Sequence, residues 1–182
     1  MIIDAQIHIW APETPEKPYA KGNASEPHRP IPLDHEELLR EMDGAGVHRC
    51  VLVPPTWEAD RNDTSLEAAR LHPERFAVMG RLKINAPESR ALVATWKEQP
   101  HMLGIRMVFN HGRSREWLED GTADWFWAAA ERYDIPVMAF APGAVPKLAA
   151  IAERHSGLRM IIDHMGLSTA LRGKPLDPAG DD

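Results

Sequence analysis

The sequence has few of the signals that mark secreted, membrane or nucleic-acid-binding proteins. Its 182 residues contain one cysteine, Cys50, so no disulfide can form within the chain, and a reducing compartment fits. Lysine and arginine total 21 against 27 acidic residues and form no basic run, which gives no support to a nucleic-acid or acidic-membrane partner. No signal peptide is visible, and no apolar run approaches the roughly 20 residues that cross a bilayer. We expect a cytoplasmic protein that binds a small molecule.

Six short apolar runs alternate with segments of helical periodicity. Each run is rich in Val, Ile, Leu, Met and Phe, and several end at Pro or Gly, as buried strands do. The order strand, helix, strand, at intervals of about 25–30 residues, predicts βαβ units and a parallel sheet covered on both faces. The predicted strands lie within residues 1–10, 49–55, 75–82, 103–109, 135–142 and 158–166.

Capping patterns predict where two of the helices begin. Asp34, followed three residues later by Glu37, is typical of a helix N-terminus. Thr64 and Glu67 repeat this spacing ahead of the next helical segment. We therefore expect Asp34 and Thr64 to be N-cap residues.

Two α/β architectures compete for this order of elements. A doubly wound sheet normally has a Gly-rich phosphate loop after its first strand, whereas this strand is followed by APETPEKP, which has no glycine. A (β/α)-barrel fits better, because polar residues fall at the strand ends that carry the active sites of such barrels. We predict one domain over residues 1–182, of the (β/α)8 TIM-barrel type with about six βα units. Residues 11–32, rich in proline, form a long loop, and residues 168–182 a loose tail.

The first predicted strand carries a polar residue at every second position. Asp4, Gln6 and His8 alternate with apolar residues, so their side chains should share one face of the sheet. Polar groups that face a barrel interior cost free energy unless they are hydrogen-bonded. A buried Asp–His bond between strands is the structural interpretation, but three polar residues in register favour a functional site.

Two further predicted strand ends carry charged residues. Asp163 and His164 end the sixth strand, where a helix cap is the alternative role of Asp163. Arg106 lies among apolar residues in the fourth strand, and Arg81 raises the same question in the third. A buried guanidinium needs an anionic partner. That partner is either a protein carboxylate, such as Asp4 or Asp163, or a ligand carboxylate, which we favour for Arg106.

Three residues that follow strands complete the set of candidates. Trp10 and Trp57 follow the first and second strands, where they form either an aromatic wall for a planar substrate or packing within loops. His111 follows the fourth strand and is a candidate for the mouth of the barrel. With Arg106, these residues are the predicted substrate-binding side chains.

In this order, the segments IDAQIHIW, MDGAGVHRCVLVPP, HPERFAVMGRL, GIRMVF and IIDHMG resemble the amidohydrolase-related TIM-barrel hydrolases. The nearest branch is the one that includes pyrone-dicarboxylate lactonase and sugar-lactone hydrolases, and the resemblance extends from Met1 to about Asp177. It implies that the chain stops before strands seven and eight of the barrel. The edges of the first and sixth strands would then be open, so a homo-oligomer or another association that covers these edges is the expected partner.

The resemblance also implies a ligand set for a divalent metal. The family holds this metal with two histidines of the first strand, one histidine each from strands five and six, and an aspartate from strand eight. By position, His8 matches the second histidine and His164 the histidine of strand six, whereas Gln6 replaces the first histidine. Phe140 and Ala141 end strand five. An amide is a poor zinc ligand, so we expect no cofactor, with zinc on His8 and His164 as the alternative.

These correspondences predict a hydrolase that opens a lactone-type ring ester of a small carboxylated compound without a tightly bound metal. Gln6 with a histidine, either His8 or His164, would polarise the carbonyl for attack by water, and Arg106 would bind the substrate carboxylate. The general base of the family, the aspartate of strand eight, has no counterpart here. The alternatives are a metal-dependent decarboxylase of an aromatic or unsaturated acid and an inactive, truncated barrel fragment.

Overall fold

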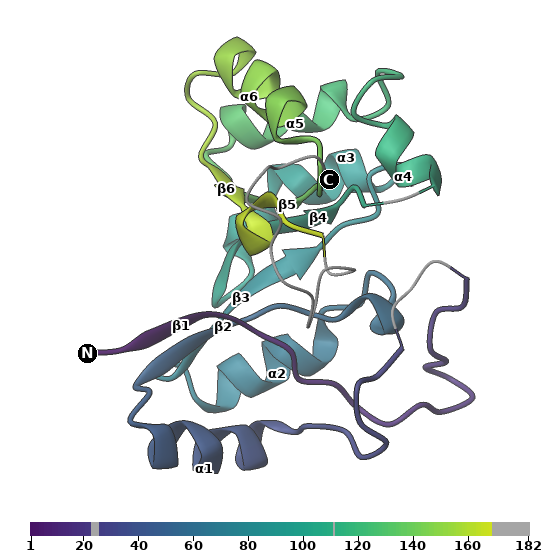
Figure 1. The fold of residues 1–182 in the computed structure, drawn as a ribbon. Helices are drawn as coiled ribbons and strands as arrows, with labels where there is room; N and C mark the ends of the chain where they lie inside the picture. Colours follow the sequence, from purple (N-terminus) through teal and green to yellow (C-terminus); the bar gives the residue numbers. More distant parts are fainter. Residues whose placement is uncertain (23–25, 111, 169–182) are drawn as a thin grey trace, which may run out of the picture. The chain divides into compact units, whose positions relative to one another are not determined.

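The computed structural model describes residues 1–22, 26–110 and 112–168, and its strands and helices alternate along the chain (Figure 1). The strands follow one another in chain order within one sheet. β1 to β4 pair in parallel, as do β5 and β6. This is the α/β sheet of an incomplete TIM barrel, so the predicted fold class is confirmed. The strands are β1 (Ile3–Ile7), β2 (Arg49–Leu52), β3 (Phe76–Arg81), β4 (Met102–Val108), β5 (Val137–Phe140) and β6 (Met160–Ile162).

Helices and short 3-10 turns connect the strands. None of the described helices is long and apolar enough to cross a membrane. The helices are α1 (His35–Ala45), α2 (Asp63–Leu71), α3 (Ser89–Ala94), α4 (Gly112–Glu116), α5 (Asp124–Arg132) and α6 (Val145–Arg154). The 3-10 turns are η1 (Thr56–Glu58), η2 (Trp96–Glu98) and η3 (Asp163–Gly166).

The predicted cap of α1 is confirmed, and the predicted cap of α2 is wrong. The Asp34 side chain accepts a hydrogen bond from the Glu37 backbone N–H at 2.8 Å. Helix α2 begins at Asp63, so Thr64 is already inside the helix. Its hydroxyl lies 3.3 Å from Glu58 Oε1 and donates to that carboxylate. The N-cap is Asn62, so the capping pattern identified the helix but placed its start two positions too late.

The chain divides into two compact units, Met1–Arg106 and Met107–Asp182. The first unit holds β1 to β3 and most of β4, and the second holds the end of β4 with β5 and β6. The single domain expected over residues 1–182 stays a prediction. The expected loose tail begins at Ser168, and from residue 169 onward it lies outside the described residues.

The first unit buries the apolar stripes of its helices. Figure 1 shows α1 and α2 on the same side of β1 and β2. Leu38 and Met42, one helical turn apart on α1, are buried, as are Ala68 and Ala69 on α2. Burial of a side chain such as Leu or Met contributes about 1.5–3 kcal/mol, so these stripes hold the helices against the sheet.

The second unit has an aromatic core. Phe126 and Trp127 of α5 lie with their ring centroids 5.2 Å apart, and Trp127 lies 5.7 Å from Phe109. All three side chains are buried. The Phe109 N–H donates to the Phe140 carbonyl at 2.7 Å, which joins the segment after β4 to the end of β5. Figure 1 shows α5 and α6 together on one side of β5 and β6.

The outer strands expose apolar residues. Among the described strands, β1 and β6 each have a neighbour on one side. Ile2 and Ile3 are exposed at β1, and Ile161 and Ile162 at β6. Exposed apolar edges of this kind can pair with another chain. The association expected to cover them stays a prediction.

Trp96 packs over a glycine of β3. A Cβ atom added to Gly80 would lie 2.8 Å from Trp96 Cζ2 and 2.8 Å from Met102 Sδ. The Trp96 indole N–H donates to the Gly104 carbonyl of β4 at 3.0 Å, so the ring cannot move away freely. The missing side chain at Gly80 therefore makes room for the indole to cover β3 and β4.

Gly80→Ala is expected to lower the free energy of unfolding by about 1–3 kcal/mol, because the added methyl group overpacks against a hydrogen-bonded ring. Urea denaturation followed by circular dichroism measures this change. Gly44→Ala is the matched control, since Gly44 lies inside α1 with nothing within 4 Å of an added Cβ. The control should gain roughly 0.5–1 kcal/mol. Equal stability of Gly80→Ala and the unsubstituted chain would contradict this packing.

Candidate active site

The predicted polar face of β1 is interrupted by a bulge. The register of β1 against β2 shifts between Asp4 and Ile7, and strict alternation does not hold across such a shift. The shared face of Asp4, Gln6 and His8 therefore stays a prediction. Asp4 Oδ1 accepts the Gln6 backbone N–H at 3.0 Å.

The Cys50 thiol lies opposite Asp4 in the register of β1 and β2. Burial, and after it the charge of Asp4, raises the pKa of this thiol to about 12. The thiol therefore stays protonated and is no nucleophile.

Gln6 brings a buried, unpaired amide nitrogen to the end of β1. Its Nε2 has no hydrogen-bond partner within the described part of the chain. A buried donor left unpaired costs about 1–3 kcal/mol, and such donors are rare in folded proteins. A ligand oxygen in hydrogen-bond contact with Nε2 would remove this penalty.

His8 follows β1 and is oriented by the residue after β2. Its Nδ1 lies 2.6 Å from the Val53 carbonyl oxygen, and the Val53 N–H donates to the Ile7 carbonyl at 2.8 Å. A carbonyl oxygen only accepts, so Nδ1 carries the proton and Nε2 of the neutral ring carries a lone pair. In this tautomer His8 can accept a proton at Nε2.

Trp10 and Trp57 lie side by side in the first unit. Their ring centroids are 5.2 Å apart with planes at 88°, and the Trp57 ring lies 6.1 Å from that of His8. Both tryptophans line a cavity of about 680 Å³ together with Tyr19 and His28. Trp10 is only 1% exposed and Trp57 5%. The two rings therefore pack against each other within the loops and also form one wall of a cavity.

Arg81 ends β3 and is held by the loop that follows β2. The Asn62 side chain accepts the Arg81 backbone N–H at 2.7 Å and donates to the Arg81 carbonyl at 3.0 Å. The Arg81 guanidinium donates to the Ala59 carbonyl at 2.7 Å and lies 3.6 Å from the Asp60 carboxylate. Its protein partner is therefore Asp60, and neither of the two carboxylates considered from the sequence.

Arg106 lies beside Arg81 on β4. The two residues are register partners, so their side chains leave the same face of the sheet. Arg106 is 5% exposed, as expected from its apolar neighbours in sequence. Burial is the main cause that lowers the pKa of Arg81 to about 10. The charge of Arg106 also lowers this pKa, whereas Asp60 opposes the decrease. Arg81 Nη1 is buried and has no hydrogen-bond partner among the described residues. An anion in contact with Arg81 Nη1 would satisfy this unpaired donor.

The second unit carries Asp163 and His164 in η3, directly after β6. The N-cap of this turn is Ile162, so Asp163, which is 3% exposed, does not have the helix-cap role. His164 Nε2 lies 3.7 Å from Asp163 Oδ1, and its ring meets the Phe140 ring edge-on at 5.0 Å. The φ angle of His164 is 50°, a left-handed conformation that costs roughly 1–2 kcal/mol outside glycine. The candidate His111 lies outside the described residues.

Sequence reasoning missed two residues of the loop after β2, Glu58 and Asn62. The stretch EADRND around them is polar and typical of a turn, which predicts solvent exposure. Glu58 is instead 1% exposed, and both polar atoms of the Asn62 amide bind the backbone of β3. No pattern in a single sequence distinguishes these buried contacts from a solvated turn.

The metal implied by the family resemblance does not fit the residues. No three His, Cys, Asp or Glu side chains come together as a possible metal site in the part of the chain that the structure describes. Gln6 offers an amide in the place of an imidazole, and Phe140 and Ala141 at the end of β5 offer no ligand atom in their side chains. We therefore assign no catalytic step to a metal.

Known proteins with similar sequence or structure include hydrolases and a decarboxylase. The chain is 28% identical over 166 residues to L-fucono-1,5-lactonase of Burkholderia ambifaria, covering 89% of this chain and 56% of the lactonase. A probable 2-pyrone-4,6-dicarboxylic acid hydrolase from Acinetobacter baumannii, with citric acid bound, has a TM-score of 0.72 at 18% identity over 91% of this chain and 58% of that one. A 5-carboxyvanillate decarboxylase from Novosphingobium aromaticivorans, complexed with manganese, has a TM-score of 0.59 at 21% identity over 74% of this chain and 50% of that one.

The chain thus spans little more than half the length of the lactonase that it matches. The two structural similarities are at low identity and show the shared fold. The model of the amidohydrolase family matches residues 3–178, nearly the whole chain, and confirms the resemblance seen in the sequence motifs. The chain belongs to the amidohydrolase family.

Proposed function

We propose that this amidohydrolase hydrolyses a lactone-type ring ester of a small carboxylated compound without a metal. The observation that carries the proposal is the buried, unpaired Nε2 of Gln6. It is a hydrogen-bond donor at the position where the resemblance implies a metal ligand. The similarity to a fuconolactonase supports a lactone as the substrate.

Gln6 would stabilise the charge that develops on the lactone carbonyl. When water adds to the carbonyl carbon, the carbonyl oxygen becomes an oxyanion, and its hydrogen bond to Gln6 Nε2 strengthens. Removal of one such donor from an enzyme typically costs about 3–4 kcal/mol of transition-state stabilisation, or about 100- to 1000-fold in kcat. This contribution needs no change in the position of Gln6 during the reaction.

His8 would be the general base. Its Nδ1–H is held by the Val53 carbonyl, so Nε2 can take a proton from the attacking water. A bond forms between the water oxygen and the carbonyl carbon, and the ring C–O bond breaks. The proton on Nε2 then passes to the departing ring oxygen, so the product is a hydroxy acid and His8 returns to its neutral form.

Arg106 would bind the substrate carboxylate, with Arg81 Nη1 as a second donor. Arg81 and Arg106 are register partners, and Arg81 pairs with Asp60 while its buried Nη1 has no hydrogen-bond partner among the described residues. A substrate carboxylate would accept the hydrogen bond that this Nη1 offers. The probable 2-pyrone-4,6-dicarboxylic acid hydrolase that shares this fold has citric acid bound, which is a polycarboxylate and fits this class of ligand.

The other predicted site residues stay proposals. Trp10 and Trp57 would contact the ring of the substrate, and His164, in the second unit, stays the catalytic candidate named from the sequence. His111 remains a candidate for substrate binding. The small-molecule substrate is thus the proposed partner of the site, in keeping with the cavity that the two tryptophans line.

Metal-dependent decarboxylation is the alternative reaction. The related carboxyvanillate decarboxylase binds manganese, so the same fold can support that chemistry. Gln6 argues against it in this chain, because an amide replaces the imidazole implied at that position. A chain without any activity is the other alternative.

The test is an assay of the chain with carboxylated lactones and with aromatic acids, in the presence and absence of a chelator. We expect lactone opening, measured as proton release, and the same rate after EDTA treatment. Loss of lactone opening in EDTA and its return with zinc or manganese would contradict the metal-free mechanism. Decarboxylation of the aromatic acids would favour the alternative reaction, and no turnover of any substrate would contradict the proposal.

Gln6→Leu is expected to lower kcat by about 100- to 1000-fold with little change in KM, because the donor acts mainly in the transition state. The matched control is Gln99→Leu, since Gln99 is only partly buried and its side-chain NH₂ donates to the Trp96 carbonyl of its own turn. This control should keep full activity. A similar kcat for Gln6→Leu and Gln99→Leu would exclude Gln6 from the chemistry.

A further inference from the structure

A proline-rich segment, residues 11–20, folds back on itself and is called the strap below. Its ends meet where the Tyr19 hydroxyl donates to the Ala11 carbonyl at 2.7 Å. Between them, Thr14 and Lys17 exchange backbone hydrogen bonds, and the Lys17 N–H also reaches Thr14 Oγ1 at 3.1 Å. These internal bonds make the strap one structural piece that can dock or detach as a whole.

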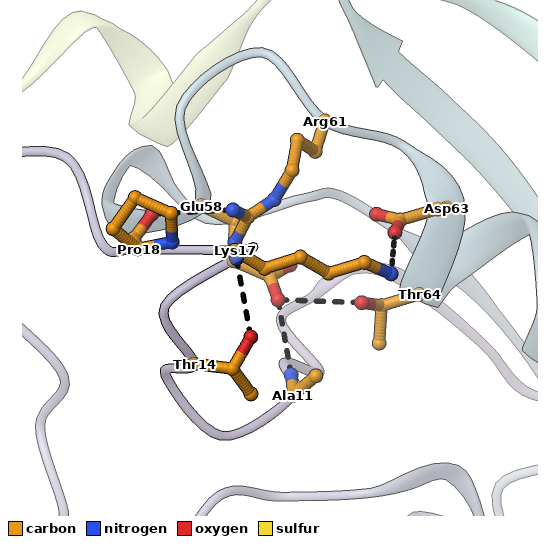
Figure 2. A network of polar contacts seen from close by, with 8 residues as sticks. All are labelled: Ala11, Thr14, Lys17, Pro18, Glu58, Arg61, Asp63 and Thr64. Atoms are coloured by element: carbon orange, nitrogen blue, oxygen red, sulfur yellow. Dashed lines mark hydrogen bonds and ion pairs between the residues drawn. The ribbon is translucent and has the colours of Figure 1, made fainter.

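The strap is held by a buried carboxylate in the loop after β2. Glu58 is 1% exposed, and its Oε1 accepts the Ala11 backbone N–H at 3.0 Å and the Thr64 hydroxyl at 3.3 Å (Figure 2). One oxygen atom thus joins the strap, η1 and the first turn of α2. A buried acceptor with two donors is more than a surface contact, because the loss of this oxygen leaves a backbone N–H unpaired.

Three further contacts dock the strap to the same loop and helix. Lys17 forms an ion pair with Asp63, and Arg61 Nη1 donates to the Pro18 carbonyl at 3.2 Å (Figure 2). At the end of the strap, the Ala20 N–H donates to the Trp57 carbonyl at 2.7 Å. Glu58 is the most buried of the side chains that dock the strap, and the other docking side chains lie nearer to solvent.

The contact also fixes the aromatic wall of the cavity. Ala11 directly follows Trp10 in the chain, and Glu58 directly follows Trp57, so the bond between Ala11 and Glu58 joins the two backbones beside the rings. The rings lie 5.2 Å apart, and the Trp57 ring lies next to His8. We infer that Glu58 is a positioning residue, which docks the strap and thereby keeps the tryptophan pair in place beside His8. Its effect on catalysis rests on the proposed function, whereas its effect on the strap does not.

Glu58 performs this task as a hydrogen-bond acceptor, so its charge is not required. Burial raises the pKa of Glu58 above the ordinary value for a glutamate, and the nearby Asp63 adds to the increase. The Ala11 N–H, Arg61 and Thr64 oppose this increase. Tyr19 of the strap faces the same carboxylate, and after burial the charge of Glu58 is the main cause of the raised pKa of its hydroxyl. A neutral glutamine would keep the accepting oxygen and remove the buried charge.

Glu58→Gln is therefore expected to melt at a higher temperature than the unsubstituted chain at pH 8. A carboxyl group whose pKa is raised by folding stabilises the fold below its unfolded pKa and loses this contribution as the pH rises through the folded pKa. The advantage of the glutamine should accordingly shrink as the pH falls and vanish at about pH 4, where both side chains are neutral. Differential scanning calorimetry from pH 4 to pH 8 measures this difference. An advantage that is the same at every pH would contradict it.

The positioning role is tested by amide hydrogen exchange in Glu58→Met, which keeps the volume of the side chain and removes the acceptor. We expect the Ala11 and Ala20 amides to exchange at least about tenfold faster, and Glu58→Gln to restore their protection. The Ala20 amide is the decisive readout, because it donates to the Trp57 carbonyl, which Glu58→Met leaves in place. Faster exchange at Ala20 therefore reports detachment of the whole strap. Glu131→Ala is the control, since Glu131 holds the Gly157 N–H in the second unit in the same way, and it should leave both amides unaffected.

Faster exchange of Ala11 alone would contradict the docking of the strap as one piece. If Glu58→Met does not fold, Glu58→Asp shortens the side chain by one methylene group and withdraws the acceptor from the Ala11 N–H, and unchanged Ala11 and Ala20 protection in that variant would contradict the role of Glu58. In the lactone assay, Glu58→Met should lose about 10- to 100-fold in activity and Glu58→Gln should regain it. Equal loss in both variants would overturn positioning in favour of a role for the carboxylate charge. Faster strap exchange in a chain that opens no lactone would leave the positioning role intact and reject the proposed function.

Discussion

The backbone of Val53 ties the end of β1 to the loop after β2, and the arrangement of the candidate site depends on this tie. Its N–H binds the last carbonyl of β1, and its carbonyl accepts the His8 Nδ1 proton. The second bond decides which nitrogen of His8 can take a proton. The same loop then holds the end of β3 through Asn62 and the strap through Glu58. One loop of about ten residues thus sets the positions of an imidazole, a guanidinium and an aromatic wall.

The strands and helices were predictable because their signals are local. Continuous apolar runs located the strands, and the pair Asp34 and Glu37 located a helix start whose hydrogen bond spans three residues. The bulge in β1 was not predictable, because a register shift depends on the partner strand. Thr64 fits the capping pattern equally well, but its hydroxyl binds Glu58, a residue outside the helix.

The candidate site was predictable in its residue types and not in its contacts. The burial of Arg106 followed from its apolar neighbours, whereas the pairing of Arg81 with Asp60 depends on the path of a loop. Glu58 and Asn62 were missed, because buried and solvated polar turns have the same composition. Gln6 was informative from the sequence, since an amide is a poorer metal ligand than the imidazole implied at that position. Its unpaired Nε2 gives this substitution a chemical consequence.

The central claim is that the Gln6 amide donates to the substrate, and NMR of the side-chain amides tests it most directly. The chain contains two glutamines, Gln6 and Gln99, so selective ¹⁵N-glutamine labelling gives two pairs of side-chain NH₂ signals. Addition of a non-hydrolysable carboxylated lactone analogue should shift the Gln6 protons downfield and leave those of Gln99 unchanged. Saturating analogue that leaves the Gln6 signals at their original positions would contradict the account.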